Sequence, residues 1–109
     1  MAEQNKAIHK MAQRVMDGYE AVHNKQYDKG KQLLEPLLSF LHQEEKPNVT
    51  LLCYVAISQI GSKDIDNFLK TFEELQKHEP KNNKEAALKE RVEKMFEELM
   101  GSLSDNLGE

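Results

Sequence analysis

The sequence has few of the residues that cross-link a chain or interrupt its helices. Among 109 residues there are one cysteine, five glycines and three prolines. The single cysteine, Cys53, excludes an intramolecular disulfide, so nothing points to an oxidising compartment. Most of the glycines and prolines lie at the ends of apolar periodic segments. This distribution predicts helices joined by short turns rather than a loop-rich fold.

The sequence also lacks the features of a nucleic-acid-binding protein. Its net charge is −4, its lysines alternate with glutamates, and it has no tryptophan, three tyrosines and four phenylalanines. Nucleic-acid binding calls for a basic stripe along the phosphate backbone or an aromatic platform for stacked bases. Neither is present, so we expect no nucleic-acid partner.

Long apolar runs are missing as well. No stretch approaches the roughly 18 consecutive apolar residues of a membrane span, and residues 1–6 lack the apolar run of a signal peptide. We therefore expect no membrane partner and a cytoplasmic protein.

Residue patterns typical of catalysis or metal binding are absent. There is no glycine-rich phosphate loop, no Gly-x-Ser-x-Gly elbow and no His-Glu-x-x-His. The four histidines fall in separate sequence contexts, each with at most one carboxylate a helical turn away, and two ligands do not make a zinc site. We expect no catalytic residues, cofactor or metal, and hence no enzyme. An enzyme built on dispersed residues is the alternative, but no residue can be nominated for it.

What the sequence does contain is apolar residues at helical spacing. This spacing predicts five helices, at about 4–23, 27–43, 48–61, 62–78 and 84–100. Pro36 falls inside the second and predicts a kink, and either Asn48 or Thr50 is expected to cap the third. Residues 51–57 are apolar nearly all round, which predicts the most buried helix. A strand is the competing reading, but no other segment could pair with it.

These helices predict an all-α fold with one domain at 1–102 and a frayed tail at 103–109. The first four helices form two antiparallel hairpins that repeat about 38 residues apart, and the fifth helix caps the second hairpin.

The hairpins resemble degenerate tetratricopeptide repeats, helix pairs that stack into scaffolds for binding other proteins. The resemblance covers residues 11–82 and is carried by Lys25 to Gly30, which are similar to the inter-helix turn, and by Phe68 to Pro80, which are similar to the second helix and its closing proline. Gly18 and Ala56 fall where the family requires close helix approach, although Arg14 and Leu52 occupy its tryptophan position. A five-helix bundle without repeats is the alternative.

The resemblance implies a function in protein binding. In that family the first helix of each pair lines the concave face. This would place Tyr19, Val22 and His23 from one hairpin beside Cys53, Ile57 and Ile60 from the other. We expect a non-enzymatic adaptor or regulator that binds a helical or extended segment of another protein in this groove. We also expect a monomer or weak dimer. The alternative is a structural subunit that self-associates through the last helix, whose seam comprises Leu88, Val92, Met95 and Leu99.

Overall fold

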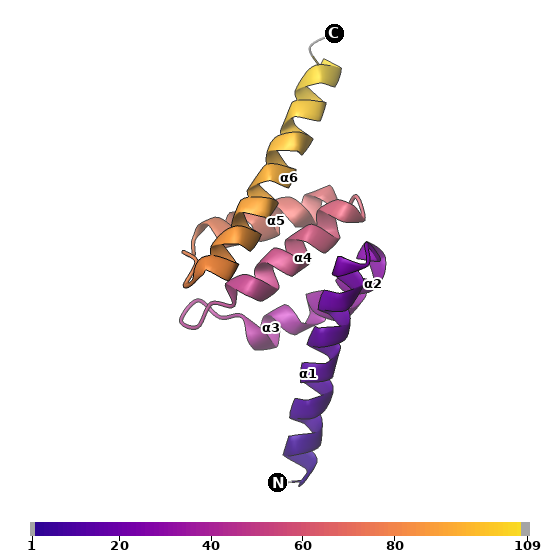
Figure 1. Cartoon of the computed structure of the whole chain (residues 1–109), viewed down its shortest axis with the longest axis vertical. Helices are drawn as coiled ribbons and strands as arrows, with labels where there is room; N and C mark the ends of the chain where they lie inside the picture. Colours follow the sequence, from indigo (N-terminus) through magenta and orange to yellow (C-terminus); the bar gives the residue numbers. More distant parts are fainter. Residues whose placement is uncertain (1, 108–109) are drawn as a thin grey trace.

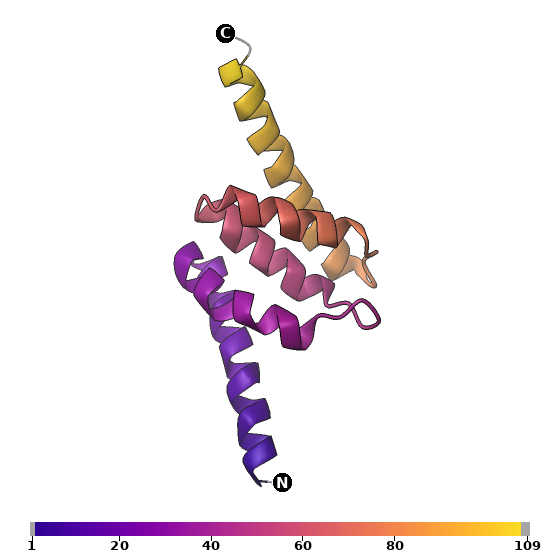
Figure 2. The same cartoon turned by 180° about the vertical axis from the view of Figure 1, so that it is seen from behind.

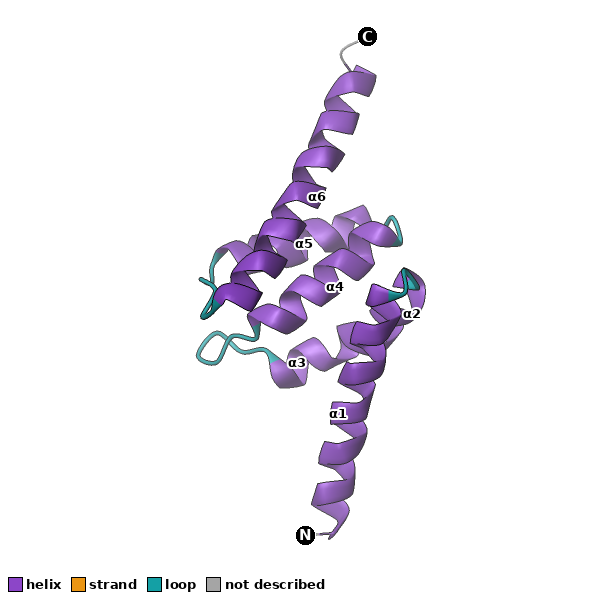
Figure 3. Cartoon of the chain, in the orientation of Figure 1, coloured by secondary structure: helices purple, strands orange, loops and turns teal. Residues whose placement is uncertain are grey.

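Every regular element in residues 2–107 is a helix (Figure 3). This computed structural model describes the backbone of residues 2–107 and the side chains of residues 6–104. The elements are α1 (Ala2–His23), α2 (Tyr27–Leu34), the 3-10 turn η1 (Glu35–Leu37), α3 (Leu38–Leu41), α4 (Val49–Gly61), α5 (Ile65–Gln76) and α6 (Asn83–Leu107). The predicted all-α fold is confirmed.

The core is organised around α4, which lies between α2 on one side and α5 on the other (Figures 1 and 2). Ten of its 13 residues are buried, as expected for a helix that is apolar all round. Its first turn is capped by Asn48, whose Oδ1 accepts a hydrogen bond from the Leu51 amide at 3.0 Å. Of the two predicted caps, Asn48 is therefore the one used.

The second predicted helix is kinked at Pro36 into α2, η1 and α3. Proline has no amide hydrogen to donate to the carbonyl four residues earlier, that of Gln32. The guanidinium of Arg14 on α1 takes its place, because Nη2 donates to Gln32 O at 3.0 Å and Nε donates to Leu33 O at 2.8 Å. The predicted kink is confirmed, and a side chain from another helix supplies the donor that Pro36 lacks.

Two glycines allow the helices to cross closely. A Cβ at Gly18 would lie 2.4 Å from Cδ2 of the buried Leu34, and one at Gly61 would lie 2.4 Å from Cγ of Tyr27. Neither position has room for a side chain. The close approach expected at Gly18 is confirmed, and it brings α1 against α2.

The last helix packs its N-terminal half on the core and projects beyond it (Figure 1). Val92 is fully buried, and Phe96 stacks on Phe72 with ring centroids 4.4 Å apart. The seam considered for self-association, which comprises Leu88, Val92, Met95 and Leu99, packs against this chain's own core.

α6 ends at Leu107 rather than near residue 100. Gly101 has the lowest helix propensity in this stretch, and a single glycine costs a helix only about 1 kcal/mol. Of the predicted tail, residues 103–107 continue α6, while residues 108–109 lie outside the described part of the chain.

The N-terminal half of α1 also projects, at the opposite end of the molecule (Figures 1 and 2). The two projecting ends give the chain principal extents of 61 × 27 × 22 Å. Of the helices that the structure describes, none is both long and apolar enough to cross a bilayer.

Candidate functional site

Three of the predicted groove residues belong to the core. Val22 is 1% exposed, and Cys53 and Ile57 are 0% exposed. Val22 is covered where α2 crosses α1 at Gly30, and Ile57 lies in α4, which is enclosed by its neighbours. The expectation that these side chains stand exposed in an empty groove is therefore wrong.

The other three predicted groove residues lie nearer the surface, and two of them meet around Tyr54 of α4. The ring of Tyr19 stacks on that of Tyr54 with centroids 4.0 Å apart, and Nε2 of the exposed His23 lies 2.8 Å from the Tyr54 hydroxyl. Burial, together with the neighbouring Tyr54 and Cys53, raises the pKa of Tyr19 to about 12. Ile60 is half-buried against the core. Packing among these residues fills most of the expected groove.

An uncovered apolar surface is found instead on the projecting half of α1. Ile8 is 66% exposed, and Met11 and Val15 are half-buried. A hollow of about 280 Å³ separates this part of α1 from α3, and its lining is apolar: Ile8, Met11, Ala12, Val15 and Leu41. A second hollow, of about 550 Å³, lies on the other side of Met11 and reaches Leu37. Leu37 itself is 6% exposed and belongs to the core. We refer to Ile8, Met11, Val15 and Leu41 as the α1 surface.

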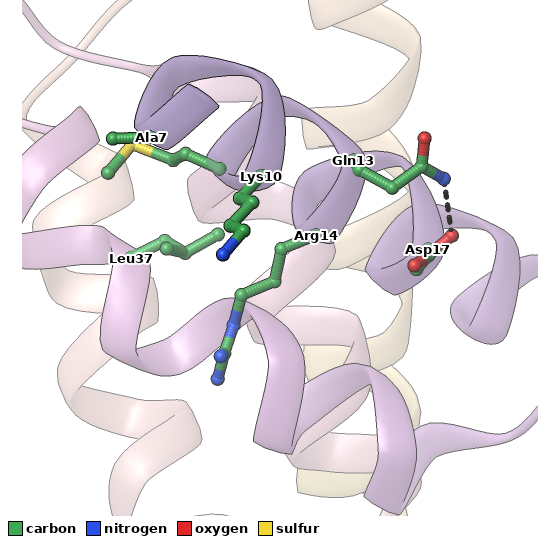
Figure 4. A pocket seen from close by; sticks show the side chains of 7 residues that line it. Ala7, Lys10, Gln13, Arg14, Asp17 and Leu37 are labelled. Atoms are coloured by element: carbon green, nitrogen blue, oxygen red, sulfur yellow. Dashed lines mark hydrogen bonds between the residues drawn. The ribbon is translucent and has the colours of Figure 1, made fainter. Parts of the chain in front are cut away.

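The rim of the α1 surface carries two basic residues, Lys10 and Arg14, and one acidic residue, Asp17 (Figure 4). Residues 6–14 include Lys6, Lys10 and Arg14 and no acidic residue. Lys10 and Arg14 line the larger hollow, and Gln13 beside them donates a hydrogen bond to Asp17 Oδ1 at 2.9 Å. The surface thus combines an apolar floor with positive charge at its edge.

Sequence reasoning identified the apolar stripe of α1 but not which part of it is covered. The stripe runs from Ile8 to Val22, and only its C-terminal portion is buried by α2 and α4. After the kink at Pro36 the chain crosses α1 (Figure 1), and the described residues 6–10 of α1 are all exposed. The one available signal was Pro36 itself, which predicts a kink but not its direction.

The structure also joins two histidines that the sequence placed in separate contexts. Nε2 of His42 and Nε2 of His78 lie 2.9 and 3.0 Å from the same carboxylate oxygen, Oε2 of Glu74. Both imidazoles are largely buried, with 11% and 12% of their side chains exposed. His42 and His78 are far apart in the sequence and meet in space because Glu74 of α5 contacts the residue that follows α3.

These three residues have the ligand types of a metal site, but their hydrogen bonds point to another role. Nδ1 of His42 accepts a hydrogen bond from the backbone amide of Asn48 at 3.0 Å. The ring proton is therefore on Nε2 and is donated to Glu74. A metal would need a lone pair on that nitrogen. Hydrogen bonds from His42 and His78, together with Lys77, lower the pKa of Glu74 to about 2. The three side chains thus form a hydrogen-bonded cluster that links the end of α3 to α5.

Comparisons with protein-family models, with curated proteins and with solved structures find no match to this chain. The all-α fold class therefore stands on the structure itself, and the tetratricopeptide-like assignment stays a prediction.

Proposed function

We propose that this protein is a non-enzymatic adaptor or regulator that binds an amphipathic helix of another protein on the α1 surface. The observation that carries the proposal is the 66% exposure of Ile8 beside an apolar hollow. An isolated exposed apolar residue needs no explanation, but one that continues into an apolar depression is typical of a binding site. The site differs from the predicted groove, because Val22 and Ile57 are core residues.

The chemistry of the surface defines the partner segment. Apolar side chains at i and i+3 or i+4 of a helix would fill the hollows on the two sides of Met11. Lys10 and Arg14 at the rim favour acidic residues beside that stripe. The preferred partner is therefore an acidic amphipathic helix.

Two chemical features of the described residues also support a binding role. Cys53 is fully buried, and burial raises the pKa of its thiol to about 12, so it supplies neither a nucleophile nor an exposed thiol. The residues that line the α1 surface include no histidine, serine or cysteine. Binding, rather than catalysis, is what these side chains offer.

The proposal is tested by affinity capture from the native host with three baits. Ile8→Glu places a charge on the α1 surface, whereas the control Leu69→Glu changes a residue that is 39% exposed on α5. A partner bound through the surface is recovered by the wild type and by Leu69→Glu. It is lost with Ile8→Glu, because removing an apolar anchor typically costs about 2 kcal/mol or more, roughly thirtyfold in affinity. Equal recovery by all three baits would contradict the proposal.

Self-association is the second candidate function. The exposed side chain of Leu103, on the projecting half of α6, favours it. The seam at Leu88, Val92, Met95 and Leu99 is already used within the chain, so an assembly contact would have to use the end of α6.

A further inference from the structure

We infer that the α1 surface receives the C-terminal end of α6 from a second copy of this chain. This inference rests on the proposed function, because it names the occupant of the same surface. We refer to residues 97–107 of α6 as the α6 tip.

Charge complementarity favours this occupant. The α6 tip contains Glu97, Glu98 and Asp105 and no basic residue. Residues 6–14 of α1 contain three basic residues and no acidic one. The two segments therefore carry opposite signs of charge, so bringing them together is electrostatically favourable.

The apolar positions of the two segments also match. Met100 is half-buried and Leu103 is 43% exposed, and they lie three residues apart on one side of α6. Ile8 and Met11 have the same separation on α1. A helix that presents residues at i and i+3 lays them along one stripe, so Met100 and Leu103 can enter the hollows on the two sides of Met11. The α6 tip is thus an acidic amphipathic helix of the kind that the surface favours.

The shape of the molecule determines how such contacts combine. The α1 surface and the α6 tip lie at opposite ends of the long axis, which extends 61 Å (Figures 1 and 2). A chain therefore cannot fill its own α1 surface with its own tip. The contact joins two different surfaces, so each added copy leaves one of each kind unoccupied, and assembly proceeds head to tail.

Sedimentation velocity over about 10 to 500 µM protein, a range chosen for a contact of moderate affinity, tests the inference. The wild type should increase in average mass with concentration. Association should weaken severalfold between roughly 0.05 and 0.5 M salt, because exposed charge pairs are screened. A wild type that stays monomeric throughout the range overturns the inference.

Two variants identify the surfaces involved. Ile8→Glu blocks the α1 surface and Leu103→Lys blocks the α6 tip, and each alone should be monomeric. Mixed together they should form a 1:1 dimer that grows no further, since the intact tip of the first variant can dock on the intact surface of the second. Leu69→Lys, on α5, is the control and should associate as the wild type does.

Other outcomes are equally informative. If Ile8→Glu alone still associates, the contact is a symmetric one through α6 and the inference is wrong. A mixture that stays monomeric also overturns it. Should either variant lose helicity, the reversal pair Lys10→Glu and Glu98→Lys gives a second route. Each variant alone should associate more weakly, and mixing the two should restore association, because position 10 of either variant then faces the opposite charge at position 98 of the other.

The same results leave the proposed function separately testable. If self-association fails but a host protein is still captured by the wild type and lost with Ile8→Glu, the surface binds a helix of a different protein. If both fail, the α1 surface is not a binding site.

Discussion

At the scale of single residues, two helical glycines have opposite environments. A Cβ at Gly18 would lie 2.4 and 2.5 Å from Cδ2 and Cγ of Leu34, whose side chain is fully buried and cannot move aside. A Cβ at Gly101 would meet no heavy atom within 4 Å among the described residues. The same substitution should therefore have opposite effects at the two positions.

We expect Gly18→Ala to lower the free energy of unfolding by about 1–3 kcal/mol through overpacking. Gly101→Ala should raise it by up to about 1 kcal/mol, because alanine loses less backbone entropy in a helix. Urea unfolding of both variants measures the difference. If Gly18→Ala were also stabilising, α1 and α2 would not be in the close contact described.

Glu74 predicts a specific dependence of stability on pH. Its pKa is about 2 in the folded protein, against an ordinary value of 4.5. The unfolded chain thus takes up the proton at higher pH than the folded one, and protonation favours unfolding. The contribution of Glu74 is complete above pH 4.5 and is lost as the pH falls toward 2.

Urea unfolding at a series of pH values between 6 and 2.5 should show this loss. Glu74→Gln removes the titrating group, so the variant should be less stable than the wild type near neutral pH, and the gap between them should narrow as the pH falls. A gap that is constant with pH would mean that His42 and His78 do not stabilise the carboxylate.

At the scale of elements, the kinked segment α2, η1 and α3 depends on a side chain from α1. Pro36 leaves the Gln32 carbonyl without its helical donor, and Arg14 donates to that carbonyl and to Leu33 O. The kink turns α3 across α1, and this creates the hollow of the α1 surface. Arg14 and Pro36 therefore connect the shape of the kinked segment to the candidate site, because Arg14 also lines the larger hollow.

A double-mutant cycle measures this coupling. Arg14→Ala should lower the free energy of unfolding by about 1 kcal/mol, since a hydrogen bond contributes about 0.5–1.5 kcal/mol and this guanidinium is exposed. In a Pro36→Ala background, the decrease in unfolding free energy caused by Arg14→Ala should be smaller by about 0.5 kcal/mol or more, because residue 36 then supplies an amide donor. Gln13→Ala removes a hydrogen bond to the Asp17 carboxylate and none to the kinked segment, so it should show no coupling to Pro36. Additive effects of Arg14 and Pro36 would contradict this account.

At the scale of the whole molecule, the projecting ends of α1 and α6 determine the shape. The Cα radius of gyration is 15.0 Å, whereas a compact domain of this length has a value of about 13 Å. The ends add length without adding much core, and two of the large apolar side chains that stay exposed, Ile8 and Leu103, lie on them.

Deleting residues 101–109 should therefore change shape more than stability. We expect a smaller radius of gyration in small-angle X-ray scattering and a free energy of unfolding within about 0.5 kcal/mol of the wild type, as for other surface changes. The scattering is compared at low protein concentration, where copies are separate. A loss of stability above about 2 kcal/mol would show that the tip contributes to the core.

Much of the helical architecture follows from the sequence. Residues 51–57 are apolar all round, and such a segment has to be enclosed by the others, which is why α4 is central. Asn48 has a side-chain oxygen at the position where a helix needs an acceptor for its free amides. Both features are local, and local chemistry can be read from neighbouring residues. The end of α6 was missed because a single glycine and a polar composition do not by themselves stop a helix.

The candidate site depended on tertiary structure. The periodicity of α1 defines an apolar stripe from Ile8 to Val22 but not how much of it a neighbour covers, and the direction of the kink at Pro36 decides that. The hydrogen-bonded cluster joins His42 to Glu74, which are 32 positions apart in the sequence. Sequence by itself determined the helices, the buried centre and the presence of a kink, because these follow from the spacing and chemistry of adjacent residues. Only the packing of the helices decided which apolar side chains stay exposed and which polar ones meet, because both depend on contacts between segments far apart in the chain.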